Sequence, residues 1–139
     1  MHEHFVIKVA DEIPLEKAGP LLCAGITMYD PLKHWGASEG NKSVGIIGIG
    51  GLGTMGIKLA KAMGNRVVAI STTPSKEAMA KEKGADAFIV SKDPESMKNE
   101  TAKLDLILNT VSAAHECSEY LPLLAQGGIL VQLGVVGEP

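Results

Sequence analysis

Short apolar runs alternate with segments of helical periodicity along most of the chain. The apolar runs predict five strands, at residues 44–47, 66–70, Ala87–Val90, Leu104–Asn109 and 129–133. Helical patterns follow the first four runs, at residues 53–64, 73–84, 93–101 and 113–125. Strands that are apolar throughout are typical of a sheet covered by helices on both faces. The alternation therefore predicts a doubly wound α/β fold with a parallel sheet and right-handed crossovers.

Capping residues set the expected limits of these helices. Thr73 and Asp93 each precede a proline, so each is expected to cap a helix that has proline at its first position. The helix after residue 53 is expected to end at Gly64, and the last helix at Gly127, because glycine readily adopts the left-handed conformation that follows a helix.

The first forty residues are less regular. Residues 5–9 predict a strand. Residues 15–29 show a helical pattern interrupted at Gly19 and Pro20, and the second half of this pattern is apolar almost all round. Such a helix is expected to be buried on most sides. Residues 30–41 are expected to form a segment that connects this helix to the next strand.

The strongest chemical signal is the glycine pattern G-x-G-x-x-G at residues 48–53, placed between a predicted strand and a predicted helix. Gly48 allows a sharp turn, Gly50 and Gly51 leave backbone N–H groups open to a pyrophosphate, and Gly53 lets the helix lie close to the strand. An anion there would meet unpaired N–H donors and the positive end of the helix dipole. The pattern predicts dinucleotide binding, and an incidental turn is the alternative.

The end of the second predicted strand indicates which dinucleotide. NAD-binding folds usually place an acidic residue about twenty residues after the glycines, where it binds the ribose 2′-hydroxyl. Here the chain carries Ser71, Thr72, Thr73 and Lys76 before the first acid, Glu77. Hydroxyls and a lysine suit the 2′-phosphate of NADP, and the missing acid also argues against S-adenosylmethionine. The alternative is that the hydroxyls only cap the next helix.

Composition narrows the function classes further. The chain has 139 residues, is 45% hydrophobic and 21% charged, and carries a net charge of −3, which suits one α/β domain. Its basic residues are not clustered, so no nucleic-acid or membrane-surface footprint is expected. With no secretory signal pattern and no apolar run of membrane-spanning length, the expectation is a cytoplasmic protein. Cys117 and His115 are expected to be structural and helix-surface residues, and His34 and Trp35 a domain-junction contact.

Four stretches resemble the cinnamyl alcohol dehydrogenase branch of the zinc-dependent medium-chain alcohol dehydrogenases. They are residues 4–36, 44–64, 71–86 and 127–139, and the most specific feature is LLCAGIT followed by GIGGLG. The resemblance covers essentially the whole chain. It implies an NADP-dependent enzyme that interconverts small primary alcohols and aldehydes by hydride transfer at a catalytic zinc.

The same resemblance implies roles for individual residues. Cys23 matches the third protein ligand of the catalytic zinc, and Thr27 matches a nearby cofactor contact. The pyrophosphate loop corresponds to Gly48, Ile49, Gly50, Gly51, Leu52 and Gly53, and the NADP-selecting segment to Ser71, Thr72, Thr73 and Lys76. The nicotinamide half is expected at Thr110, Val111, Leu133, Gly134 and Val135. Thr54, where relatives often carry His, and the threonines at 72 and 73, where they often carry Ser, depart from the pattern but remove no hydroxyl from the expected pocket.

The resemblance also implies a division of the chain. Residues 1–22 are expected to be a junction segment of a catalytic domain, and residues 23–139 an NADP-binding domain that lacks its sixth strand. The other zinc ligands and most of the substrate pocket are expected in segments that this chain does not contain. By itself the chain is therefore expected to bind cofactor without catalysis or zinc, and the edge at residues 129–133 to self-associate in place of the family's homodimer. The alternative is a free-standing NADP(H)-binding or sensing module.

Overall fold

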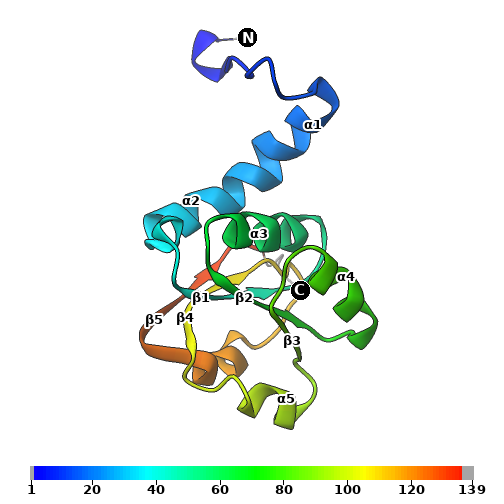
Figure 1. Ribbon diagram of the computed structural model, residues 1–139, viewed down its shortest axis with the longest axis vertical. Helices are drawn as coiled ribbons and strands as arrows, with labels where there is room; N and C mark the ends of the chain where they lie inside the picture. Colours follow the sequence, from blue (N-terminus) through cyan, green and yellow to red (C-terminus); the bar gives the residue numbers. More distant parts are fainter. Residues whose placement is uncertain (1, 136–139) are drawn as a thin grey trace.

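The computed structural model describes residues 2–135 and contains one five-stranded parallel sheet (Figure 1). Its strands are β1 (Ser43–Ile47), β2 (Arg66–Ser71), β3 (Ala87–Val90), β4 (Leu104–Asn109) and β5 (Leu124–Gln132), in the spatial order β3-β2-β1-β4-β5. The helices are α1 (Leu15–Pro20), α2 (Ile26–His34), α3 (Gly51–Ala62), α4 (Glu77–Glu82) and α5 (Pro94–Lys98). The predicted fold class is confirmed. Within residues 2–135, every helix is too short or too polar to cross a membrane.

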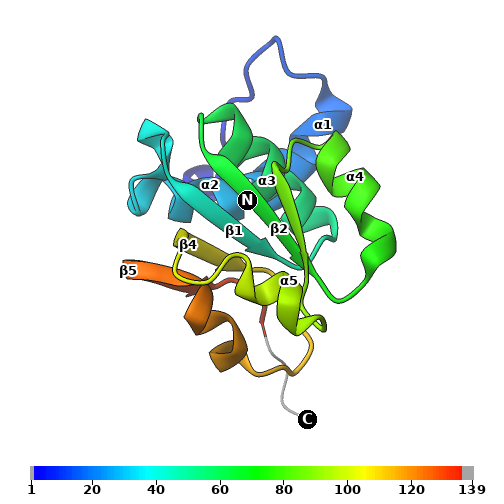
Figure 2. The same cartoon turned by 60° about the horizontal axis from the view of Figure 1, so that its bottom comes forward.

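Helices cover both faces of the sheet, because alternate residues of each strand point to opposite sides. On one face, Ile46 and Leu108 pack with Met28 of α2 and Ile57 of α3. On the other face, apolar residues of β1, β2 and β4 pack with α5 and with a 3₁₀ segment, Cys117–Leu123. Figures 1 and 2 show α3 and α4 on the first face and α5 on the second. The strands are therefore buried from both sides, as their apolar composition predicted.

Two of the predicted helix limits are confirmed and one capping role is wrong. Gly64 has φ +82° directly after the last turn of α3, and the side chain of Asp93 accepts a hydrogen bond of 3.1 Å from the backbone N–H of Glu95. Thr73 precedes a 3₁₀ turn, Pro74–Lys76, and its side chain makes no capping bond. Instead the Thr73 N–H donates to Ser71 Oγ at 3.2 Å, so the Ser71 hydroxyl is engaged in the turn.

The predicted strand at residues 5–9 is wrong. The chain forms a 3₁₀ turn at Glu3–Phe5 and then runs on without joining the sheet or any other described strand. Phe5, Val6 and Ile7 are exposed there. A β-branched run does not make a strand by itself, because its backbone groups need a neighbouring strand to bond with.

The predicted helix at residues 15–29 continues further than expected and is less buried. From α1 the chain passes through a wide π-helical segment, Leu21–Gly25, into α2, with Pro20 at the join. The connecting segment expected from residue 30 is helical as far as His34. One side of α2 packs on the sheet and α3 through Met28 and Leu32, which are fully buried.

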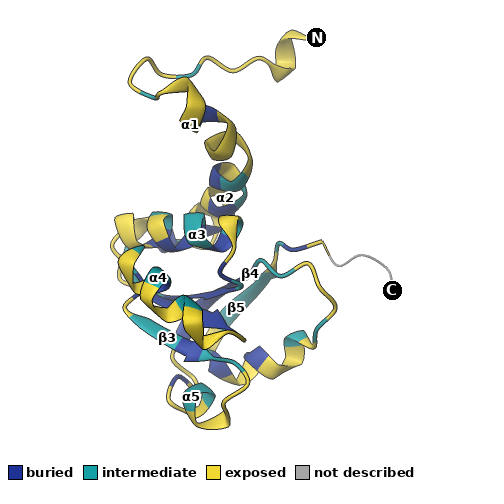
Figure 3. Ribbon diagram, turned by 90° about the vertical axis from the view of Figure 1, so that its right-hand side faces the viewer, coloured by how far each residue is buried: buried dark blue, intermediate teal, exposed yellow. Residues whose placement is uncertain are grey.

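Residues 15–34 together form a helical arm, and the side of this arm opposite the sheet is exposed (Figure 3). Leu22 and Ile26 leave 53% and 54% of their surface accessible. The expectation of a helix buried on most sides is therefore wrong for the described residues, because only one side meets the sheet layer. Figure 1 shows α1 projecting away from the sheet.

The helix predicted at residues 113–125 is also wrong. Residues 113–116 form an irregular loop, Cys117–Leu123 is 3₁₀, and β5 begins at Leu124 rather than residue 129. Pro122 lacks an N–H group, and its carbonyl accepts a bond of 2.9 Å from the Ala102 N–H instead of a helical partner. Gly127 does not end a helix, since its φ of +78° lies within β5 beside an irregular stretch of the ladder with β4.

Among the described strands β5 pairs only with β4, so it is an edge of this sheet. Self-association through this edge stays a prediction.

Carboxylates fasten the amino-terminal ends of two strands. Asp86 Oδ2 accepts a bond of 2.8 Å from the Val67 N–H, and Asp86 Oδ1 lies 2.6 Å from Lys61 Nζ. Asp105 Oδ2 accepts a bond of 2.8 Å from the Ser43 N–H. Burial, the largest effect on Asp86, raises the pKa of its carboxyl, but the bonds from Lys61 and Val67 and the nearby cations together lower this pKa below its ordinary value.

This lowered pKa predicts an acid-dependent loss of stability. The stabilisation from ionised Asp86 is complete above the carboxyl's unfolded pKa and disappears as pH falls through the lower folded pKa. Asp86→Asn removes that contribution, so urea unfolding from pH 7 to pH 3 should show a shallower loss of stability in this variant than in wild type. Asp11→Asn, at an exposed carboxylate, is the control and should follow wild type. Equal acid sensitivity of wild type and Asp86→Asn would contradict the prediction.

Candidate functional site

The segments that sequence analysis singled out meet at the carboxyl ends of the strands. The glycine loop follows β1, residues 71–76 end and follow β2, residues 110–111 follow β4, and residues 133–135 follow β5. The chain continues from β1 toward β2 on one side and from β3 across to β4 on the other, so the order of strands reverses between β1 and β4. In open α/β sheets the crevice at such a switch point is where ligands bind.

The backbone of the glycine loop has the shape that its sequence pattern requires. Gly48 has φ +87°, a conformation that L side chains rarely adopt, and its N–H donates to Ile70 O at 3.0 Å. A Cβ on Gly53 would overlap the Gly48 carbonyl oxygen. By contrast, a Cβ on Gly50 or Gly51 would meet no atom of another segment within 4 Å among the described residues. The loop is thus tight against the fold at its two ends and open between them.

The open part of the loop is the amino-terminal end of α3. Gly50 is the N-cap residue and offers no side-chain cap, and the first turn carries no acidic residue. The first backbone N–H groups of a helix lack partners within it, and the helix dipole adds positive potential at that end. This arrangement can hold a phosphate or pyrophosphate group.

The neighbouring cavity has a volume of about 340 Å³, and one of its walls consists of Ser71, Thr72, Thr73 and Lys76. Ser71 is buried, whereas Thr72 and Thr73 are exposed at the rim. Lys76 Nζ donates to Ile49 O at 3.0 Å, which ties this wall to the glycine loop. No Asp or Glu lines the cavity, so no carboxylate in its lining neutralises the positive charge of Lys76.

Half of the cavity lining was expected from the sequence. The expected members are Gly48, Ile49, Ser71, Thr72, Thr73, Lys76 and Val111. The sequence analysis missed Ile47, Ile70, Ser91, Ala113, Ala114, His115 and Tyr120. It placed the last four of these on a helix that does not form. The position of residues 113–115 just after a buried strand was the signal that could have found them, because loops at that end of a parallel strand face the crevice.

At Thr110 and Gly134 the loops after β1, β4 and β5 lie in close contact. Thr110 Oγ1 lies 2.8 Å from Ile47 O and 3.0 Å from Gly48 O, so this hydroxyl fastens the glycine turn to the end of β4. A Cβ on Gly134 would overlap the carbonyl of Val111, so only glycine fits there. Val135, in contrast, is 81% exposed and does not line this cavity.

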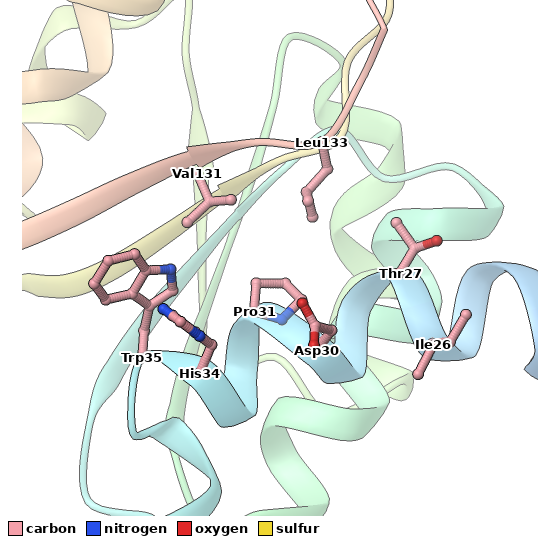
Figure 4. A pocket seen from close by; sticks show the side chains of 8 residues that line it. All are labelled: Ile26, Thr27, Asp30, Pro31, His34, Trp35, Val131 and Leu133. Carbon is pink, nitrogen blue, oxygen red and sulfur yellow. The ribbon is translucent and has the colours of Figure 1, made fainter.

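A second hollow, of about 610 Å³, lies between α2 and β5 (Figure 4). Thr27 and Leu133, both expected cofactor contacts, line it. Figure 4 shows Val131 and Leu133 pointing from the sheet toward α2, with Asp30 and His34 along the helix. The structure therefore distributes the expected contacts over two hollows, one on each face of the sheet, with the glycine loop at the strand ends.

Cys23 lies in the π-helical segment and is exposed. Its carbonyl accepts a bond of 2.8 Å from Thr27 Oγ1. Within residues 2–135 no three His, Cys, Asp or Glu side chains are grouped closely enough to hold a metal ion. A catalytic zinc takes three protein ligands, so the described residues alone do not fit a zinc site, and Cys23 could supply only one thiolate.

Comparisons with known proteins agree with the fold. Residues 51–139 match the model of the protein family described as "Zinc-binding dehydrogenase". A probable cinnamyl alcohol dehydrogenase 2 of Picea abies is 50% identical over 136 residues, which are 97% of this chain and 38% of that protein. The chain thus spans less than two fifths of the length of this curated relative.

Two solved structures are similar as well. A cinnamyl alcohol dehydrogenase from Sorghum bicolor superposes with a TM-score of 0.87 and 45% identity, over 91% of this chain and 36% of that one. The cinnamyl alcohol dehydrogenase of Helicobacter pylori, solved as a complex with NADP(H), gives a TM-score of 0.84 and 39% identity, over 95% of this chain and 36% of that one.

Alanine substitutions at Gly53 and Gly51 compare a glycine that is in close contact with the fold and one that is not. Gly53→Ala puts a methyl group into a backbone carbonyl and should lower the free energy of unfolding by about 1–3 kcal/mol or more. Gly51→Ala adds its methyl group in open space at a helix start and should leave this free energy unchanged or raise it by less than about 1 kcal/mol. Urea unfolding of both variants measures the difference. Similar stabilities would show that α3 does not depend on this contact.

Proposed function

We propose that this chain, which belongs to the zinc-binding dehydrogenase family, binds NADP(H) and forms the cofactor-binding part of an enzyme that interconverts primary alcohols and aldehydes. The observation that carries the proposal is the cavity beside the glycine loop. Hydroxyl groups and Lys76 line it, no Asp or Glu does, and the uncapped start of α3 follows directly after its lining residues Gly48 and Ile49. The solved relative from Helicobacter pylori, which is a complex with NADP(H), supports the same cofactor.

The selection of NADP(H) follows from charge. The 2′-phosphate carries negative charge that hydroxyls and a lysine stabilise and that a carboxylate would repel. Ser71, Thr72 and Thr73 present hydroxyl groups at the end of β2, and Lys76 stands one turn later. In the structure Lys76 Nζ bonds to Ile49 O, so its ammonium group is already directed toward the loop that would hold the pyrophosphate. We infer that the adenosine half lies in this cavity.

The rest of the cofactor would extend along the glycine loop. From the cavity it would cross the open backbone at Gly50 and Gly51, with its pyrophosphate at the start of α3. The nicotinamide would then lie toward the hollow between α2 and β5, where Thr27 and Leu133 are positioned. When bound, the nicotinamide supplies the hydride that is exchanged with the substrate carbon. The chain's own residues would hold the ring in place and limit the access of water on that side.

A second reading is a free-standing NADP(H)-binding or sensing module. The observation that favours it is the absence, within residues 2–135, of a group of side chains able to hold zinc with Cys23. Zinc would polarise the oxygen of the alcohol or aldehyde, which Cys23 alone does not arrange. Catalysis would then require ligands from outside the described residues. Both readings share the cofactor site, and turnover measurements separate them.

Cofactor preference is the direct test of the site. The chain should bind NADPH more tightly than NADH, as followed by the fluorescence of the reduced nicotinamide. Lys76→Ala should weaken the binding of NADPH by about 1–3 kcal/mol, because a charge-assisted bond to the phosphate is lost. It should barely affect the binding of NADH. Lys81→Ala is the matched control, since Lys81 lies on α4 and pairs with Glu77. Equal affinities for the two cofactors, or equal losses in Lys76→Ala, would refute the NADP assignment.

Metal content and turnover test whether this chain by itself holds zinc and catalyses the reaction. A polypeptide of these 139 residues should contain far less than one zinc per chain, because Cys23 has no grouped co-ligands in the described part. It should also fail to oxidise NADPH with aromatic or aliphatic aldehydes. Elemental analysis and absorbance at the reduced-nicotinamide band measure both. Stoichiometric zinc with metal-dependent turnover would mean that the chain completes a site that residues 2–135 do not show.

A further inference from the structure

A buried amide joins the two loops at the carboxyl ends of β4 and β5. Asn109, the last residue of β4, is fully buried. Its Nδ2 donates to Gln132 Oε1 at 2.7 Å and lies 2.7 Å from His115 Nε2. Its Oδ1 accepts from the Val111 N–H at 3.2 Å. Each hydrogen-bonding direction of the amide is therefore used, and each leads to a different part of the site.

The backbone and Gln132 strengthen the same connection. The carbonyl of Asn109 accepts from the N–H groups of Leu133 and Gly134, at 2.8 and 3.0 Å. Gln132 Nε2 donates to Gly134 O at 2.8 Å and to Val111 O at 3.3 Å. The loop at residues 110–116 and the segment at residues 132–134 are thus held in one relative arrangement around Asn109.

The network also specifies the state of His115. His115 Nδ1 lies 2.7 Å from Ala113 O, and a carbonyl only accepts, so Nδ1 carries the proton. Nε2 faces the NH₂ group of Asn109 and therefore accepts. The amide orientation is itself set by the Val111 N–H, which requires oxygen on that side. These assignments follow from the hydrogen-bond partners and give a neutral imidazole.

We propose that Asn109 is a positioning residue for NADP(H), which holds the cavity loop and the segment after β5 in register by bonding to a neutral His115 and to Gln132. The inference rests on the proposed function, because both segments carry expected cofactor contacts, among them Val111 and Leu133. His115 itself lines the cavity. Asn109 is buried beneath the loops and acts through the residues it holds.

Protonation of His115 should release this arrangement. A proton on Nε2 would place two donors 2.7 Å apart, and turning the Asn109 amide would leave the Val111 N–H facing another donor. The other titratable groups near His115 are Cys117, whose Sγ lies 3.7 Å from Nε2, Tyr120, whose ring centre lies 6.2 Å away, and Lys76, which lines the same cavity. None of these is a carboxylate, and among the described residues the exposed Glu116, which follows His115 in the chain, forms no ion pair or hydrogen bond with the imidazole. NADPH affinity should therefore fall as His115 becomes protonated.

The first variant replaces the amide with an apolar side chain of the same branching and the same number of heavy atoms. Asn109→Leu should weaken NADPH binding at pH 7.5 by at least about tenfold, because the loops lose their common partner and His115 and Gln132 keep unpaired groups. Asn99→Leu is the matched control, because Asn99 is exposed after α5. It should bind NADPH as wild type does. Circular dichroism establishes that each variant is folded.

The second variant reverses the pH dependence. In Asn109→Asp the carboxylate accepts from Val111 N–H and from Nε2–H, so the loops are held best when His115 is an imidazolium. Binding should be weaker than in wild type throughout, because the carboxylate meets Gln132 Oε1 where wild type has a donor, and it should weaken further as pH rises, whereas wild type weakens as pH falls. The cofactor's own phosphate titrates identically for both proteins, so the ratio of their dissociation constants isolates the effect. His115→Gln should flatten this ratio. Nitrogen-15 NMR of the wild-type imidazole should show a protonated Nδ1 and an unprotonated Nε2.

Each outcome decides between this inference and the proposed function. Wild type that binds no NADPH at any pH overturns the proposed function and the inference together. Wild type that binds NADPH, with a folded Asn109→Leu variant of equal affinity, overturns the positioning role alone. If Asn109→Leu does not fold, the pH dependence of Asn109→Asp decides: the opposite slope supports the role, and the wild-type slope overturns it.

Discussion

The approach of α3 to the turn after β1 is the constraint on which the site depends. The helix begins directly against the end of the strand, and this is possible because Gly53 has no side chain. A Cβ there would overlap the Gly48 carbonyl oxygen. The apolar side of α3 is then in place to cover the sheet through Ile57 and Ala60. The same contact points the unpaired N–H groups of the first helical turn into the crevice at the switch point. One steric condition therefore fixes both the packing of the first crossover and the location of the helix start that we propose as the pyrophosphate site.

Around this fixed point the other loops are held by polar atoms rather than by apolar packing. Thr110 bonds to the carbonyls of Ile47 and Gly48, and Lys76 bonds to Ile49. Asn109 links the loops after β4 and β5. Hydrogen bonds in a buried environment are directional and costly to leave unmade, so they define loop positions more sharply than apolar contacts can. This suits a binding crevice whose walls come from four different strands.

The helical arm at residues 15–34 has a different physical character. Met28 and Leu32 anchor it to the sheet layer, while Leu22 and Ile26 remain exposed on its other side. An exposed apolar face of this kind is typical of a surface that packs against another part of a protein. The curated relative from Picea abies is much longer than this chain, which matches 38% of it. Cys23 belongs to this arm and is exposed.

The sequence by itself determined strands β1 to β4, the glycine turn and the Asp93 cap, because each rests on local properties: apolar runs, a positive φ, or a side chain that reaches its own helix start. It failed where partners distant in sequence decide. Residues 5–9 lack a neighbouring strand, and the helix predicted at 113–125 does not form, because Ala102 takes the Pro122 carbonyl and Asn109 bonds to His115. Only the tertiary structure brings His115 into the cavity. Hydrophobic patterns record burial, but they do not record which distant polar atom a loop will bond to.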